Sequence, residues 1–232
     1  MPSLTHEQTQ RAIEALDSVL NAPARPDGRS AMEYWDERDQ LRRQAIDDSL
    51  RPLVMSFLSE SVDLADFKSR VLGLNQRHDH WGVAEEGGGR FMEAYVATAP
   101  DMDECVRELR EALAAPTSEN GAREKLSRFL SHATRHGAQP GGGEGTPDAE
   151  VIPFLLSWSW QVQDRDTWPV QFGVSIEAME RLGLFVAAGD SADDYIVFKQ
   201  TCEELADVFK NRSGRFFGHY EVERVMRSAG KR

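Results

Sequence analysis

Residues 101–136 read DMDECVRELREALAAPTSENGAREKLSRFLSHATRH, and this stretch indicates the class of the fold. Apolar side chains recur every three or four residues on either side of Pro116, which is the spacing of one face of an α-helix. They are Met102, Cys105, Val106, Leu109 and Leu113 before the proline, and Ala122, Leu126, Phe129, Leu130 and Ala133 after it. Because proline interrupts helices, the stretch predicts two short amphipathic helices joined near Pro116.

The same helical period continues in both directions along the chain. Toward the N-terminus, Thr5 with Gln8 and Ser30 with Glu33 form capping boxes that predict two further helices. Toward the C-terminus, a long apolar stripe runs through residues 195–209. We therefore expect a mainly α-helical protein.

Residues 137–147 read GAQPGGGEGTP, with five glycines, two prolines and no large apolar side chain. Such a composition is typical of a flexible joint. It predicts an N-terminal helical lobe at 1–136 and a tryptophan-rich C-terminal helical lobe at 148–232, packed against each other. Residues 168–172, WPVQF, alternate like a short strand, so we expect at most a minor β element there.

The chain has 232 residues and a formal net charge of −12, which disfavours non-specific attraction to nucleic acid or to an anionic membrane. The charge is uneven, since residues 210–232 carry +5 and residues 1–209 carry −17. If nucleic acid binds, we expect its phosphates to meet the cations of this basic segment, namely Lys210, Arg212, Arg215, Arg224 and Arg227. The alternative is a solvated terminal helix.

The N-terminal residues lack the basic start and apolar run of a signal peptide, and no apolar stretch approaches the length of a membrane span. We expect a cytoplasmic protein with no membrane contact. Its two cysteines, Cys105 and Cys202, each lie in a helical apolar pattern. They are expected to be buried free thiols, and the sequence supports neither a disulfide framework nor a zinc site built on cysteines.

Two histidines have the spacing of metal ligands. His132 and His136 are four residues apart on a predicted helix, so both imidazoles share one face, as zinc ligands require. The alternative for His136 is a favourable interaction with the dipole at the end of the helix.

Residues 75–90, NQRHDHWGVAEEGGGR, interrupt the helical period with four glycines. This segment concentrates His78, His80 and Trp81, which makes it a candidate loop for a ligand or partner, with a solvated loop as the alternative. Together with His132 and His136, the two loop histidines would form a four-histidine set if packing brought them together.

Two other patterns do not make a catalytic or nucleotide site. Residues 189–191, GDS, match the opening of one class of serine esterases, but no partner Asp-x-x-His follows, and a capping box of Ser191 with Asp194 explains the same residues. The glycine runs at 87–89 and 141–143 have neither a preceding strand nor a following Gly-Lys-Ser/Thr.

The second half of the chain resembles a known family. The blocks are PFLLSWSWQVQD at 153–164, WPV at 168–170 and AMERLGL at 178–184. Their succession resembles a pattern in the helical N-terminal modules that precede McrB-like ATPase or nuclease domains in prokaryotic restriction and anti-phage defence proteins. The resemblance implies a non-catalytic binding or regulatory module without a cofactor, docking a protein partner such as an ATPase or nuclease subunit, or nucleic acid.

Two other function classes stay open at this point. One is a metal-dependent hydrolase or nuclease that uses His78, His80, His132 and His136. The other is an acidic protein that mimics DNA through its negatively charged helices.

Overall fold

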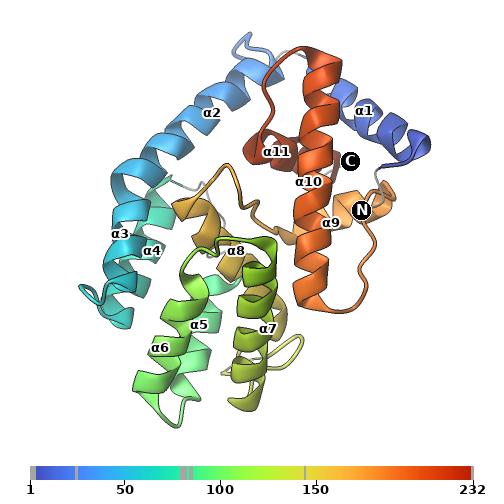
Figure 1. The fold of residues 1–232 in the computed structure, drawn as a ribbon. Coiled ribbons are helices and arrows are strands. Elements are labelled where there is room, and N and C mark those ends of the chain that lie inside the picture. Colours follow the sequence, from blue (N-terminus) through green and yellow to red (C-terminus); the bar gives the residue numbers. More distant parts are fainter. Residues whose placement is uncertain (1–3, 24–25, 79–82, 84–85, 144, 231–232) are drawn as a thin grey trace.

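The structure is a computed structural model that describes residues 4–23, 26–78, 83, 86–143 and 145–230. Within these residues it is built from helices, and no strand is present. The helices are α1 (His6–Leu20), α2 (Ala31–Ala45), α3 (Arg51–Leu58), α4 (Leu64–His78), α5 (Gly88–Ala97), α6 (Met102–Leu113), α7 (Glu119–Arg135), α8 (Ile152–Gln163), α9 (Gly173–Arg181), α10 (Ser191–Ser213) and α11 (His219–Gly230), with a π-helical turn at Ile46–Leu50 and a 3₁₀ turn at Ala149–Val151 (Figure 1). The mainly α-helical class is confirmed.

Several helix starts lie where the sequence places them. Thr5 and Ser30 form the two capping boxes, each accepting a hydrogen bond from the backbone of the third helical residue while that residue's side chain binds back. The start of α10 differs, because Asp190 is the capping residue and Ser191 is the first residue of the helix. Asp194 instead accepts hydrogen bonds from the backbone amides that precede the helix.

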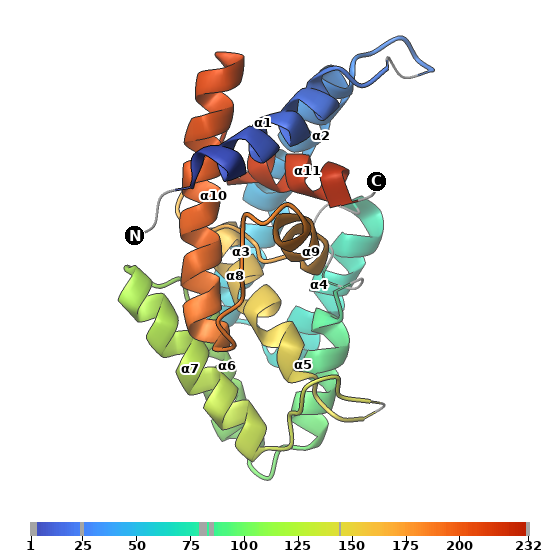
Figure 2. The ribbon, with the colours of Figure 1, turned by 90° about the vertical axis from the view of Figure 1, so that its right-hand side faces the viewer.

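Helix α8 is the centre of the molecule. Every side chain from Ile152 to Val162 is buried, and α3, α5, α6, α7 and α10 all contact this helix, as Figures 1 and 2 show from two sides. Trp160 is fully buried, and its indole Nε1 donates a 2.9 Å hydrogen bond to the carbonyl oxygen of Ala112 on α6. Trp168 packs edge-on against Trp160 with ring centroids 5.7 Å apart. The tryptophan-rich stretch therefore builds the core.

Residues 168–172 are irregular and form no strand. The described residues contain one isolated β-bridge, which joins Gln139 to Asp148 across the glycine-rich segment. This segment connects α7 to the 3₁₀ turn before α8. Buried side chains from both sides of it belong to one continuous hydrophobic cluster, and α7 packs along α10. The division into an N-terminal lobe at 1–136 and a C-terminal lobe at 148–232 stays a prediction.

No helix within the described residues is both long enough and apolar enough to span a lipid bilayer.

Candidate metal centre

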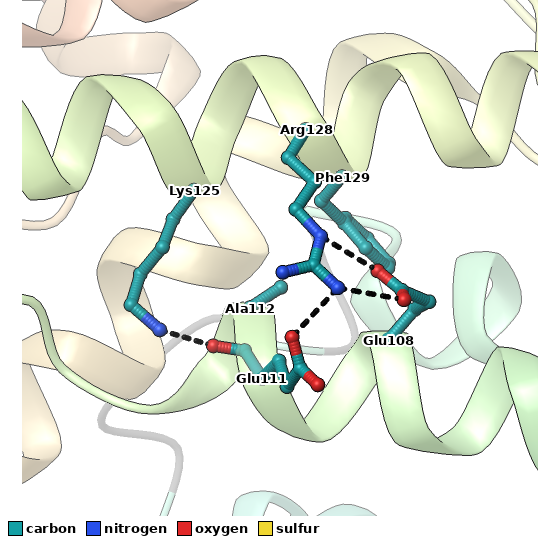
Figure 3. Close-up of a pocket in the computed structure, with 6 residues that line it drawn as sticks. All are labelled: Glu108, Glu111, Ala112, Lys125, Arg128 and Phe129. Atoms are coloured by element: carbon teal, nitrogen blue, oxygen red, sulfur yellow. Dashed lines mark hydrogen bonds and ion pairs between the residues drawn. The ribbon is translucent and has the colours of Figure 1, made fainter.

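Helices α6 and α7 contact each other and form an antiparallel hairpin. Its register is visible in two polar contacts. Arg128 donates to both carboxylate oxygens of Glu108, at 3.1 and 2.8 Å, and Lys125 donates to the backbone carbonyl oxygen of Glu111 (Figure 3). Both contacts join residues that lie opposite each other on antiparallel helices. One turn further along the hairpin, the same register places Cys105 opposite His132.

Cys105, His132 and His136 form a cluster of possible metal ligands at that end of the hairpin. Each offers one ligand atom, and these atoms all lie within 4.8 Å of one another. The Sγ atom of Cys105 is 3.7 Å from Nε2 of His132, and the two imidazole centroids are 4.4 Å apart. Cys105 is 1% exposed and His132 2% exposed, whereas His136 is half-buried and is the capping residue of α7.

The protonation state of His132 suits metal binding, whereas the Cys105 thiol must first lose its proton. Burial lowers the pKa of His132, and the neighbouring His136 lowers it further, so the His132 ring is neutral at pH 7 and has a lone pair for a metal. Burial raises the pKa of the Cys105 thiol. A metal ion must therefore displace the thiol proton, which makes binding stronger as the pH rises.

The distances are close to those of a coordination sphere. Bonds of about 2.0–2.3 Å to nitrogen and sulfur at tetrahedral angles separate ligand atoms by roughly 3.5 Å. Side-chain movements on the order of 1 Å therefore suffice to bring this cluster around one ion. One cysteine with two histidines is a ligand set that suits zinc, and also cobalt, nickel or copper in vitro.

A small cavity lies between α6 and α7, and none of the three cluster residues lines it. It has a volume of about 40 Å³ and is lined by Glu108, Glu111, Ala112, Lys125, Arg128 and Phe129 (Figure 3). Such a volume accommodates a water molecule or two, whereas ligand sites usually span about 300–1,000 Å³. Two carboxylates, Glu108 and Glu111, line this cavity, and Arg128 engages both oxygens of Glu108 and one oxygen of Glu111.

The structure brings His132 and His136 together with each other, as predicted, and adds Cys105, which the sequence placed only as a buried thiol. His80 and Trp81 lie outside the described residues, and for His78 only its backbone position at the end of α4 is described. Both cysteines are free and buried, as expected. Cys105 could have been identified as a possible ligand only from the register in which α6 and α7 pair on either side of Pro116. The sequence alone does not give this register.

The basic C-terminal segment makes internal ion pairs. Arg212 binds Asp17, Arg215 binds Asp36, Arg227 binds Glu223, and Arg224, only 4% exposed, binds Asp39. Lys210 is exposed on α10 and forms no ion pair with a described residue. Four of the five cations therefore already have carboxylate partners, and a nucleic-acid interface in this segment stays a prediction.

The chain was compared with protein families, with curated proteins and with solved structures. No family model matches it, and neither the curated proteins nor the solved structures gave a match.

Proposed function

We propose that the protein is a non-catalytic helical binding module whose α6–α7 hairpin holds one zinc ion at Cys105, His132 and His136. The observation that carries the proposal is the convergence of one thiol and two imidazoles, with ligand atoms within 4.8 Å of one another, from residues far apart in the sequence. One cysteine and two histidines with converging ligand atoms are side chains that zinc binds in proteins.

Three protein ligands leave a fourth position for water, which is also the arrangement of catalytic zinc. One feature favours a binding role over hydrolysis. Glu108 is a carboxylate whose charge acts on His132, and Arg128 engages both of its oxygens, so it is not free to act as a general base. A bound ion would instead fix α7 to α6 at the open end of their hairpin.

The proposed setting is a restriction or anti-phage system, in which the module docks an ATPase or nuclease subunit. Its support is the resemblance of residues 153–184. Of that block, residues 153–162 are buried, so this part of the resemblance concerns how the core is built. The docking surface for a partner must therefore lie elsewhere, and co-purification with the products of neighbouring genes tests this setting.

Metal binding is tested on the purified full chain. We expect one zinc per chain by elemental analysis, and a cobalt(II) form with a sulfur-to-cobalt charge-transfer band. Cys105→Ser should abolish the band, and His132→Gln should lower zinc affinity by at least about 100-fold.

Matched controls separate ligands from other residues of the same kind. Cys202→Ser removes the second buried thiol, on α10, and His6→Gln removes an exposed histidine at the start of α1. Both variants should bind zinc as the wild type does. Wild-type protein that takes up no zinc at about micromolar free metal, or Cys105→Ser protein that binds as tightly as wild type, contradicts the proposal.

A further inference from the structure

An open groove with a volume of about 650 Å³ is lined by the 3₁₀ turn, the start of α8, α9 and the start of α10. We call it the acidic groove, for the charges described below. Its apolar lining consists of Val151, Pro153, Phe154, Ile176, Phe185 and Ala187. Small-molecule sites usually have volumes of about 300–1,000 Å³. The acidic groove is therefore large enough for a ligand with an apolar part.

Every charged side chain that lines the acidic groove, among the described residues, is a carboxylate. These carboxylates belong to Glu86, Glu150, Glu177, Glu180 and Asp194. The positive charge of Arg227, on α11, acts on Glu86, but Arg227 binds Glu223 and does not line the groove. Like charges that converge without a cation repel one another, and a positively charged ligand would reduce this repulsion.

The carboxylates differ in how far the fold already satisfies them. Glu86 and Asp194 accept hydrogen bonds from backbone amides, at distances between 2.6 and 3.3 Å. Glu150, Glu177 and Glu180 are exposed, and none of these three forms an ion pair with another residue that the structure describes. Three negative charges are therefore available to a ligand.

The acidic groove also contains a hydrogen-bond acceptor that lacks a donor. Gln171 lines the groove, and its side-chain Oε1 is buried without a partner in the described part of the chain. The backbone amide of Gln171 donates to Oγ of the buried Ser157 at 3.0 Å, which holds the residue in place. Buried polar atoms usually have a partner. The N–H groups of an ammonium ion are donors that this oxygen can accept.

The spacing of the carboxylates argues against a single metal ion as the ligand. Within the described ranges, the one group of three or more side chains close enough to hold an ion is the Cys105 cluster. The carboxylates of the acidic groove are thus too far apart for three of them to share one ion. A cation that carries several charges along an apolar chain suits this spacing and can also contact the apolar lining.

We propose that the acidic groove binds a linear aliphatic polyamine. Its ammonium groups pair with the carboxylates of Glu150, Glu177 and Glu180, and one of them donates a hydrogen bond to Oε1 of Gln171. Its methylene chain lies on the apolar lining. This second ligand site goes beyond the proposed function and does not depend on zinc, so Cys105→Ser protein should bind a polyamine as the wild type does.

The test is calorimetric titration of the full chain with spermidine at about 0.15 M salt, where exposed charges are well screened. The double variant Glu177→Gln with Glu180→Gln should lower spermidine affinity by at least about 10-fold, because two charge partners are lost. The matched control is Asp48→Asn with Asp207→Asn. It changes the net charge equally at two exposed carboxylates outside the groove, and it should bind as the wild type does.

A second variant tests a different wall of the groove. Glu150→Gln, in the 3₁₀ turn, should lower spermidine affinity by about 3-fold or more. It also keeps the proposal testable if the double variant on α9 does not fold. Wild-type affinity in both Glu150→Gln and the double variant overturns the proposal.

Two diamines of equal charge test the apolar lining. Because each buried methylene group favours binding, 1,8-diaminooctane should bind the wild type at least about 10-fold more tightly than 1,3-diaminopropane. Equal affinities would show that the methylene chain makes no contact with the groove, and they would contradict the proposal.

Three further outcomes overturn the proposal. An equal loss of affinity in the Asp48→Asn, Asp207→Asn control would show that spermidine responds only to net charge. Displacement of spermidine by Mg²⁺ at the same concentration of charge would show general counterion binding. Binding of tetralysine without binding of spermidine would identify the groove as a docking surface for a basic peptide.

Discussion

The Sγ atom of Cys105 lies 3.7 Å from Nε2 of His132, although the two residues are 27 positions apart in the chain. The contact exists because α6 and α7 are antiparallel, and its register is the one that pairs Glu108 with Arg128. The proposed metal centre thus depends on the pairing of α6 with α7, and zinc binding should be measurable as a gain in the stability of this hairpin.

Zinc should stabilise the folded protein. Because the cluster forms only in the folded chain, zinc at about 100 times its dissociation constant should add about 2.7 kcal/mol to the free energy of unfolding. Thermal unfolding with zinc and then with excess chelator measures the gain and its reversal. Cys105→Ser should show no gain, and a gain of the same size in this variant would count against a role for the sulfur.

The hairpin should depend on its buried aromatic ring far more than on its ion pair. Arg128 is about three-fifths exposed, so Arg128→Ala should reduce the free energy of unfolding by less than about 1 kcal/mol. Phe129, the next residue, is 1% exposed, and Phe129→Ala should cost roughly 3–5 kcal/mol through lost burial and a cavity. Urea unfolding of the two variants decides this, and equal losses would show that the ion pair has a larger role than its exposure indicates.

The indole of Trp160, which joins α8 to α6, should contribute strongly to the free energy of unfolding. Trp160→Phe removes volume from the core and leaves the carbonyl oxygen of Ala112 without this donor, so the loss should reach roughly 2–4 kcal/mol. Trp35 is a half-buried tryptophan on α2, and Trp35→Phe should cost under about 1 kcal/mol. Denaturant unfolding followed by circular dichroism avoids relying on the tryptophan signal. A loss under about 1 kcal/mol for Trp160→Phe would contradict the packing described.

Asp39 should make stability depend on pH. Burial raises the pKa of Asp39 from 3.8 to about 6, although Arg224 opposes this effect. Between these two values the folded chain holds a proton that the unfolded chain has lost. The free energy of unfolding therefore falls as the pH rises through this window, by about 1–3 kcal/mol from this group.

The check is the difference in free energy of unfolding between wild type and Asp39→Asn, measured from pH 4 to pH 7. Subtraction removes the contributions of the other carboxyl groups, as long as these titrate alike in both proteins. The wild type should lose stability relative to the variant as the pH rises. A difference that stays constant across this range would show that Asp39 keeps an ordinary pKa.

Much of the fold was predictable because its signals are local. The apolar spacing at Leu109 and Leu113 and the capping box at Thr5 depend on neighbours within one or two turns, and the structure confirms both. The site was only half predictable for the same reason. The spacing of His132 and His136 is a property of one helix, whereas the approach of Cys105 depends on how two helices pair.

Local sequence patterns also do not show which charged side chains are already paired within the fold. Arg224 and Arg212 count as basic residues in the sequence, but each pairs with a carboxylate from α1 or α2, far away in the chain. The +5 of the terminal segment therefore does not measure the cations available to a phosphate. In the same way Ser191 matches a capping pattern, but the neighbouring Asp190 takes the role because its carboxylate reaches two backbone amides.

The burial of α8 from Ile152 to Val162 makes hydrogen exchange in this helix a measure of the stability of the whole protein. Amide hydrogens in residues 152–162 have no exposed helix face through which to exchange with deuterium locally. Their exchange should therefore require unfolding of the whole chain, and its rate should report the global free energy of unfolding. Amides of α6 and α7 near the open end of the hairpin should exchange through smaller openings. The ratio of the exchange rate in α6 and α7 to that in α8 can be followed as zinc is added. Its change would distinguish stabilisation of the hairpin alone from stabilisation of the entire fold.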